Sequence, residues 1–206
     1  MVYNYKIIVQ YDGTAYNGWQ YQPPPQRTIQ GELLKALRII SKKKVVLTGS
    51  SRTDAGVHSE GLTANFHLKF NIEADSLQRA LNSLLPRDIR VKSCEVAPKG
   101  FNARFGAISK TYVYRICFGQ VVSPFITRWV THIPYPLNLS KMRKAVPYFI
   151  GRRNFSSFTS DEPQKQRMRE VDEFTMRVRG DEITFTIKGK SFLRYMVRNI
   201  IGTIID

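Results

Sequence analysis

Hydrophobic and polar residues alternate along several stretches of the chain, as strands with one buried face require. In residues 4–11, Tyr5, Ile7, Val9 and Tyr11 fall on one side of such a pattern, which predicts a first strand. A short strand is predicted to begin at residues 45–47 and to run into the loop that follows, and further strands are predicted over residues 62–68, 89–97, 110–118, 170–179 and 183–188. The chain is therefore rich in short strands distributed over its whole length.

Apolar residues also recur at helical spacing. Thr28 is placed to cap a helix over residues 29–40, because its hydroxyl can accept a backbone N–H of the first turn. Pro86 ends a second helix, which begins at Asp75 or Ser76. The first half then has the order β-α-β-β-α-β, which is typical of a ferredoxin-like or RNA-recognition-motif unit.

The second half repeats most of this order. Ser140 caps a short amphipathic helix that we expect to kink or end at Pro147, since proline inside a helix costs about 3 kcal/mol. Gly180-Asp181 is typical of a hairpin turn between two strands. The spacing of apolar residues in 192–205 then predicts a last helix that is apolar on most sides.

Together these elements predict an α+β protein with two sub-domains, residues 1–105 and 106–206. Each is expected to be ferredoxin-like or RRM-like, with an antiparallel sheet and helices on one face. The second sub-domain is one strand short of the first. We expect the two sheets to run together as one continuous sheet.

Charge narrows the class of function. The chain carries 32 Lys and Arg against 16 Asp and Glu, a formal net charge of +16 at pH 7. Both halves are basic, with 14 Lys and Arg against 8 acids in residues 1–100 and 18 against 8 in residues 101–206. Because 42% of the residues are hydrophobic, a basic disordered tail is excluded. A folded surface of this charge attracts phosphate backbones or anionic membranes.

Other features indicate a soluble, cytoplasmic protein without membrane contacts. No apolar stretch approaches the ~20 residues of a membrane span, and the N-terminal residues lack a signal-peptide pattern. Cys94 and Cys117 lie far apart and the three histidines are scattered, which favours buried, reduced thiols and no metal site. His58 lies beside the most unusual loop of the chain, where a hydrogen-bonded structural role is expected.

That loop runs from Gly49 to His58 and carries the clearest candidate chemistry. Asp54 lies two residues after Arg52, between a short strand and a turn that contains Gly56. A nearby guanidinium favours the ionised form of a carboxyl group, and an ionised, fixed carboxylate is a nucleophile or a general base. The alternative is an Asx turn, in which Asp54 only hydrogen-bonds the backbone beside Gly56.

The segment SRTDAGVHSEG (51–61) resembles the signature loop of the TruA family of tRNA pseudouridine synthases. Four further segments resemble other motifs of that family, in the family's order: YDGTAYNGWQ (11–20), FNARFGAISKTYVYRI (101–116), GRRNFSSF (151–158) and KGKSFLRYMVRNIIG (188–202). Five ordered matches are a specific signal, whereas any one alone is weak. The resemblance implies the pseudouridine synthase fold and an isomerase of tRNA uridines that uses no cofactor and no metal.

The resemblance also assigns roles. Asp54 matches the catalytic aspartate, which either attacks the nucleoside covalently or promotes a glycal intermediate. Arg52 matches the residue that takes the space of the flipped base. Tyr112 matches the tyrosine that stacks on the target, with an ordinary strand aromatic as the alternative. Arg194 matches the basic partner of the catalytic aspartate.

Arg194 and Arg198 are four residues apart in the predicted last helix, so both are expected on one face. Buried arginines on an apolar helix need partners, because lone buried charges are costly. This indicates a carboxylate opposite them, with Asp54 as the natural candidate. The alternative is that the two arginines face solvent.

Other basic residues near the matched motifs are candidate phosphate contacts, although each alone can equally be a solvated charge. They are Arg104, Lys110, Arg152, Arg153, Lys165, Arg167 and Arg169. Structured RNA is bound through its backbone, with target bases taken from loops and stacked on aromatic rings. The resemblance implies a homodimer that binds the anticodon stem-loop of tRNA and modifies positions 38 to 40.

The sequence departs from the family in three respects. Ser51 and Leu62 stand where the family usually has Gly and Gln. The chain stops at Asp206, so we expect the second sub-domain to lack the family's final segment.

The alternative function is a non-catalytic basic RNA-binding or chaperone protein on the same fold. A metal-dependent nuclease is disfavoured, because the sequence has no cluster of acidic residues and histidines with the spacing of metal ligands.

Overall fold

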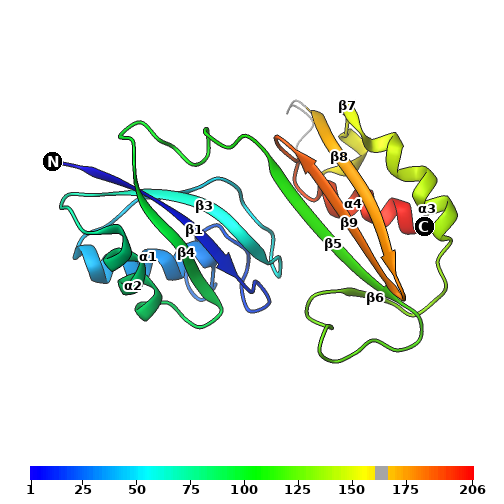
Figure 1. Cartoon of the computed structure of the whole chain (residues 1–206), viewed down its shortest axis with the longest axis horizontal. Coiled ribbons are helices and arrows are strands. Elements are labelled where there is room, and N and C mark those ends of the chain that lie inside the picture. The colour runs from blue at the N-terminus through cyan, green and yellow to red at the C-terminus, as the bar shows by residue number, and fades with distance from the viewer. Residues whose placement is uncertain (161–166) are drawn as a thin grey trace. The chain divides into compact units, whose positions relative to one another are not determined.

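A computed structural model of the chain describes residues 1–160 and 167–206. The chain divides into two compact units, Met1–Ala107 and Ile108–Asp206, and each is described by itself (Figure 1). Both combine antiparallel strands with helices, so the predicted α+β class is confirmed. The continuity of the two sheets stays a prediction.

Unit 1 has the predicted βαββαβ order. Its elements are β1 (Tyr3–Tyr11), α1 (Ile29–Ser41), β2 (Leu47–Gly49), β3 (Ser59–Leu68), α2 (Ala74–Leu84) and β4 (Ile89–Ala97). The strands form one sheet in the order β2-β3-β1-β4, and every neighbouring pair is antiparallel. The loop that carries Asp54 connects the edge strand β2 to β3.

The buried face of this sheet follows the alternation in the sequence. Tyr5, Ile7 and Val9 of the interior strand β1 are fully buried. The helices add the apolar residues at helical spacing, which are Leu33, Ala36 and Leu37 of α1 and Leu77 and Leu81 of α2. One core therefore holds both helices against the same face of the sheet.

The two helix starts of unit 1 differ in how well the sequence predicts them. The hydroxyl of Thr28 accepts the N–H of Gly31 at 3.2 Å, so the predicted cap of α1 is confirmed. The cap of α2 is Glu73, without a side-chain bond to the helix, so the prediction of Asp75 or Ser76 is wrong. Asp75 falls in the first turn instead, where a carboxylate still favours the helix dipole.

Unit 2 contains a five-stranded sheet in the order β6-β5-β9-β8-β7. Its elements are β5 (Lys110–Phe118), β6 (Thr131–Ile133), α3 (Leu139–Ala145), the 3₁₀ turn η1 (Val146–Phe149), β7 (Gly151–Asn154), the 3₁₀ turn η2 (Ser156–Phe158), β8 (Met168–Arg179), β9 (Glu182–Gly189) and α4 (Met196–Ile205). All neighbouring strands are antiparallel except β6, which runs parallel to β5. The short strands β6 and β7 were not predicted, so the expectation that this unit is one strand short of the first is wrong for the described residues.

Two turns of unit 2 confirm their sequence signals. Gly180 has a φ of 58° in the hairpin that joins β8 to β9. The α-helix α3 ends before Pro147, which lies in the first turn of η1, as expected for a residue that cannot continue a helix. The cap of α3 is Asn138, whose side chain accepts the N–H of Lys141 at 3.0 Å, and not Ser140.

The last helix is shorter than predicted. It begins at Met196, because Tyr195 has a φ of 60° in the left-handed region, which an α-helix cannot include. Arg194 therefore precedes the helix, and the argument that places Arg194 and Arg198 on one helical face is wrong. Both side chains are exposed, and the pairing of Arg194 with Asp54 stays a prediction.

Gly202 lies inside α4, where a Cβ would meet no atom within 4 Å. We expect Gly202→Ala to raise the free energy of unfolding by about 0.5–1 kcal/mol, because glycine loses more backbone entropy in a helix than alanine. Urea denaturation measures this change. Gly180→Ala is the matched control of opposite sign, since alanine is strained at its positive φ; equal effects of the two would contradict the prediction.

Both cysteines are free thiols. Cys117 is buried, as predicted, whereas Cys94 is only partly buried. Burial raises the pKa of the Cys94 thiol to about 11, so it is protonated and unreactive near neutral pH.

Among the described residues, no helix is long and apolar enough to cross a bilayer.

Candidate active site

Asp54 begins a tight turn, residues 54–57, called the Asp54 turn below. The N–H of Val57 donates to the carbonyl oxygen of Asp54 at 3.2 Å, and Gly56 has a φ of 78°. Backbone atoms close this turn, in contrast to the Asx turn that was the alternative. The Asp54 side chain is half-buried and so remains partly accessible to solvent.

Residues 16–19, which we call the clamp segment, pack against the Asp54 turn. The N–H of Trp19 donates to the carbonyl oxygen of Thr53 at 3.0 Å. The N–H of Gly56 donates to the carbonyl oxygen of Tyr16 at 3.2 Å. The first bond holds Thr53, directly before Asp54, and the second holds Gly56, two residues after it. The backbone around Asp54 is therefore fixed on both sides.

Glycines allow this close approach. Gly18 has a φ of 83°, and a Cβ there would lie 2.4 Å from the carbonyl oxygen of Thr53. A Cβ on Gly13 would lie 2.1 Å from the carbonyl oxygen of Val57. Real Cβ atoms do not approach so near, so the two loops keep their contact only without side chains at these positions.

Side chains add to the attachment of the loops. The hydroxyls of Tyr11 and Thr53 are hydrogen-bonded at 2.8 Å. The Nδ1 atom of His58 lies 3.2 Å from the N–H of Gly13 and 3.0 Å from Oδ1 of Asp12. His58 is thus hydrogen-bonded within the loops, as the sequence predicted for a structural histidine.

Arg52 and Asp54 form no ion pair within 4.0 Å of each other in unit 1. All residues of unit 1 are described, and its ion pairs do not include one between these two side chains. Arg52 is exposed, so water solvates its guanidinium. The influence of the Arg52 guanidinium on the Asp54 carboxyl group stays a prediction.

In unit 2, an aromatic pair and two stacked arginines lie near the start of α4. The ring of Tyr112 on β5 meets the edge of Phe192, with centroids 5.2 Å apart. The guanidinium groups of Arg194 and Arg198 lie 4.8 and 5.7 Å from the ring centroid of Tyr195. Arg194 also donates to the hydroxyl of Tyr195 at 3.0 Å. Both guanidinium groups therefore lie over the ring of Tyr195, the residue with the left-handed backbone conformation.

The candidate phosphate contacts of β7 and β8 fall into two groups. Arg152 and Arg153 are exposed on β7, and Arg153 pairs in register with Arg169 of β8. Like charges opposite each other on one sheet face repel and favour an anionic partner. Arg167 and Arg169 are half-buried, and each donates to a backbone carbonyl oxygen, at 3.4 and 2.7 Å. These two therefore also support the local backbone.

The remaining candidates lie at the end of unit 1 and the start of unit 2. Arg104 is exposed, with its guanidinium 5.7 Å from the ring centroid of Phe105. Lys110 is half-buried at the first position of β5. Lys165 lies outside the described residues. The roles of all these residues toward RNA stay predictions.

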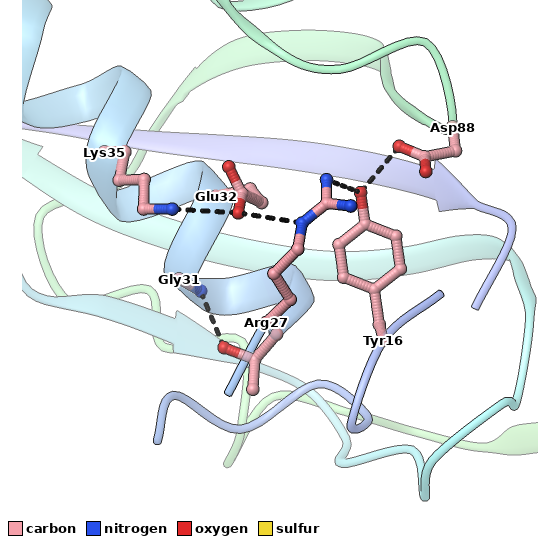
Figure 2. A network of polar contacts seen from close by, with 7 residues as sticks. Tyr16, Arg27, Gly31, Glu32, Lys35 and Asp88 are labelled. Carbon is pink, nitrogen blue, oxygen red and sulfur yellow. Dashed lines mark hydrogen bonds and ion pairs between the residues drawn. The ribbon is translucent and has the colours of Figure 1, made fainter. Parts of the chain in front are cut away.

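A polar network around Tyr16 was missed by the sequence analysis (Figure 2). The hydroxyl of Tyr16 donates to Oδ1 of Asp88 at 2.6 Å and accepts from Nη2 of Arg27 at 3.1 Å. Arg27 also pairs with Glu32 at 3.5 Å, and Glu32 with Lys35 at 3.0 Å. The motif YDGTAYNGWQ marked Tyr16 only as an aromatic residue. Its partner Asp88 is 72 positions away, and no local pattern indicates such a contact.

The fold and the site define a class: an α+β protein with antiparallel sheets, consistent with the pseudouridine synthase fold, that presents a clamped aspartate turn. The family model described as tRNA pseudouridine synthase matches residues 7–106 and 145–206. The chain belongs to this family.

Named relatives agree with the family. The tRNA pseudouridine synthase A of Thermodesulfovibrio yellowstonii is 39% identical over 214 residues, which are 98% of this chain and 84% of that protein. The enzyme of the same name from Limosilactobacillus reuteri is 38% identical over 212 residues, 100% of this chain and 82% of that one. That from Thermoanaerobacter pseudethanolicus is 41% identical over 202 residues, with 98% and 82% covered. The similarity therefore extends over nearly the whole chain.

Proposed function

We propose that this protein isomerises uridine to pseudouridine in tRNA, with Asp54 as the nucleophile. The observation that carries the proposal is the Asp54 turn, whose half-buried carboxylate is fixed on both sides by backbone bonds to the clamp segment. A nucleophile needs this kind of fixed geometry, because placement of the reacting groups supplies much of the rate. The family and the relatives' names support the same reaction.

The reaction balances without a cofactor. The C1′–N1 bond of the uridine breaks, the uracil turns, and a C1′–C5 bond forms. The hydrogen leaves C5 for solvent and a proton is taken up on N1, so no atoms or electrons are gained. Asp54 either bonds to the nucleoside until the uracil has turned or removes a proton from the ribose to give a glycal.

Other residues are proposed for the steps around the carboxylate. Arg52, exposed beside the Asp54 turn, takes the space of the extruded base, whose unstacking costs a few kcal/mol. Tyr112 stacks on the target base, and Arg194 is the basic partner of Asp54. Arg198, whose guanidinium lies over the same tyrosine ring as that of Arg194, contacts RNA.

The substrate is proposed to be the anticodon stem-loop, at positions 38 to 40, bound by a homodimer in the cytoplasm. The net charge of +16 supports a polyanionic partner, and the exposed Arg104, Arg152 and Arg153 are suited to phosphate groups. The free thiols of Cys94 and Cys117 suit a reducing compartment.

The test uses a tRNA transcript that carries tritium at C5 of its uridines. We expect the wild-type protein to release tritium to water, with the RNA at full length on a denaturing gel. A second transcript with cytidine at positions 38 to 40 should release none. RNA binding without release would overturn the enzyme in favour of an RNA-binding protein, shortened RNA would indicate a nuclease, and release from the second transcript would overturn the proposed positions.

A further inference from the structure

The clamp segment must itself be held in place before it can hold the Asp54 turn, and Tyr16 is where this happens. Its backbone carbonyl accepts the N–H of Gly56 at 3.2 Å, inside the turn. Its side chain points the other way, into the network of Asp88 and Arg27 shown in Figure 2. One residue therefore joins the turn to two distant parts of unit 1.

The partners of Tyr16 are rigidly placed. Asp88 directly precedes β4, and its carbonyl oxygen accepts the N–H of Asp12 at 2.9 Å, which fixes the start of the same loop. Arg27 precedes the cap of α1, and its carbonyl oxygen accepts the N–H of Asn17 at 2.8 Å, inside the clamp segment. The two partners of the Tyr16 hydroxyl thus hold the backbone of this loop as well.

The environment of the Tyr16 ring favours a fixed, neutral phenol. The side chain is buried, with 3% of its surface exposed, and the guanidinium of Arg27 lies 4.8 Å from the ring centroid. Burial, with the hydrogen bond to Asp88, raises the pKa of Tyr16 above its ordinary value. The hydroxyl stays protonated at neutral pH and donates to the carboxylate, and a hydrogen bond to a charged group is stronger than one between neutral groups.

We propose that Tyr16, held by Asp88 and Arg27, is a positioning residue that sets the place of the Asp54 carboxylate through the Tyr16–Gly56 backbone bond. The inference rests on the proposed function, because Asp54 is taken as the reacting group. Tyr16 is too deeply buried to contact the substrate, so it acts through the turn. Its loss should change the rate of the chemical step and leave tRNA binding unchanged.

The test is Tyr16→Phe, which keeps the ring and removes the hydroxyl. We expect kcat for tritium release to fall about tenfold with KM within about twofold of wild type, because a small displacement of a reacting group lowers the rate steeply. Amide hydrogen exchange should become faster at Gly56. Asp88→Ala should act in the same way, whereas Asp88→Asn keeps an acceptor oxygen for the hydroxyl and should restore most of kcat.

Tyr5→Phe is the matched control. The hydroxyl of Tyr5 is also buried and donates to the carbonyl oxygen of Ile72 at 2.9 Å, so its loss costs comparable stability outside the Asp54 turn. We expect the control to keep kcat and the exchange rate at Gly56. Wild-type kcat and exchange in Tyr16→Phe, or the same losses in Tyr5→Phe, would overturn the inference. If wild-type protein releases no tritium, the proposed function fails, and the exchange at Gly56 still decides whether Tyr16 holds the turn.

Discussion

Asp54→Asn is expected to abolish tritium release from C5-labelled tRNA while the protein stays folded and bound to RNA. Asparagine has almost the same shape as aspartate but is not a nucleophile or a base. Loss of the reacting group should lower the rate by on the order of 10⁴-fold or more, about 5.4 kcal/mol of activation free energy. Any release that remains comes from isomerisation without the nucleophile, assisted only by binding and base extrusion.

Stability should change little, since backbone atoms close the Asp54 turn and the carboxylate is half-buried. A substitution at such a position typically alters the free energy of unfolding by about 0.5 kcal/mol or less. The measurements are single-turnover release at saturating protein, urea denaturation, and filter binding at one fixed salt concentration, since RNA affinity depends strongly on salt.

Asp75→Asn serves as the control for Asp54→Asn. It makes the same chemical change at an exposed carboxylate, in the first turn of α2, and should leave release at the wild-type rate. Tritium release by Asp54→Asn within a few fold of wild type would contradict the role of Asp54. Equal loss in both variants would attribute the effect to net charge and not to the nucleophile.

The sequence predicted the fold where a pattern is long and local. Alternation over residues 4–11 located β1, and helical spacing with the Thr28 cap located α1. It failed where one residue decides the outcome. The left-handed backbone of Tyr195 begins α4 at Met196, and no periodicity reveals such a backbone angle, because the apolar pattern continues through it.

The candidate site shows the same division. The Asp54 loop stood out through its own sequence, since arginine, aspartate and glycine occur within a few residues. What holds the loop did not stand out, because the contacts join segments that are distant in the chain. The bond from Tyr16 to Asp88 spans 72 positions, and the clamp contacts depend on backbone atoms, which every sequence has.

Gly13→Ala is expected to lower the rate of tritium release about 100-fold, although it adds a single methyl group. The new Cβ would lie 2.1 Å from the carbonyl oxygen and 2.6 Å from the carbonyl carbon of Val57, the last residue of the Asp54 turn. Both are backbone atoms, so no side chain can rotate away, and the turn itself must move. A displacement of about 1 Å at a reacting group can cost about 10²-fold in rate.

The cost in stability should be smaller than the cost in rate. Overpacking typically destabilises by about 1–3 kcal/mol, and a surface loop can partly relax. Circular dichroism and urea denaturation should therefore show a folded, weakened protein, and filter binding should show tRNA affinity within about twofold of wild type. The loss of rate in Gly13→Ala would then come from displacement of the Asp54 carboxylate. This separates it from Asp54→Asn, in which the reacting group is absent.

Gly100→Ala provides the matched control for Gly13→Ala, because a Cβ at Gly100 would meet no atom within 4 Å. It should leave both the release rate and the free energy of unfolding near wild type. A Gly13→Ala protein that is folded and releases tritium within twofold of wild type would show that the turn tolerates displacement. The contact between the two loops is made by backbone atoms. That outcome would therefore also contradict the claim that close packing of these loops fixes Asp54 for the reaction.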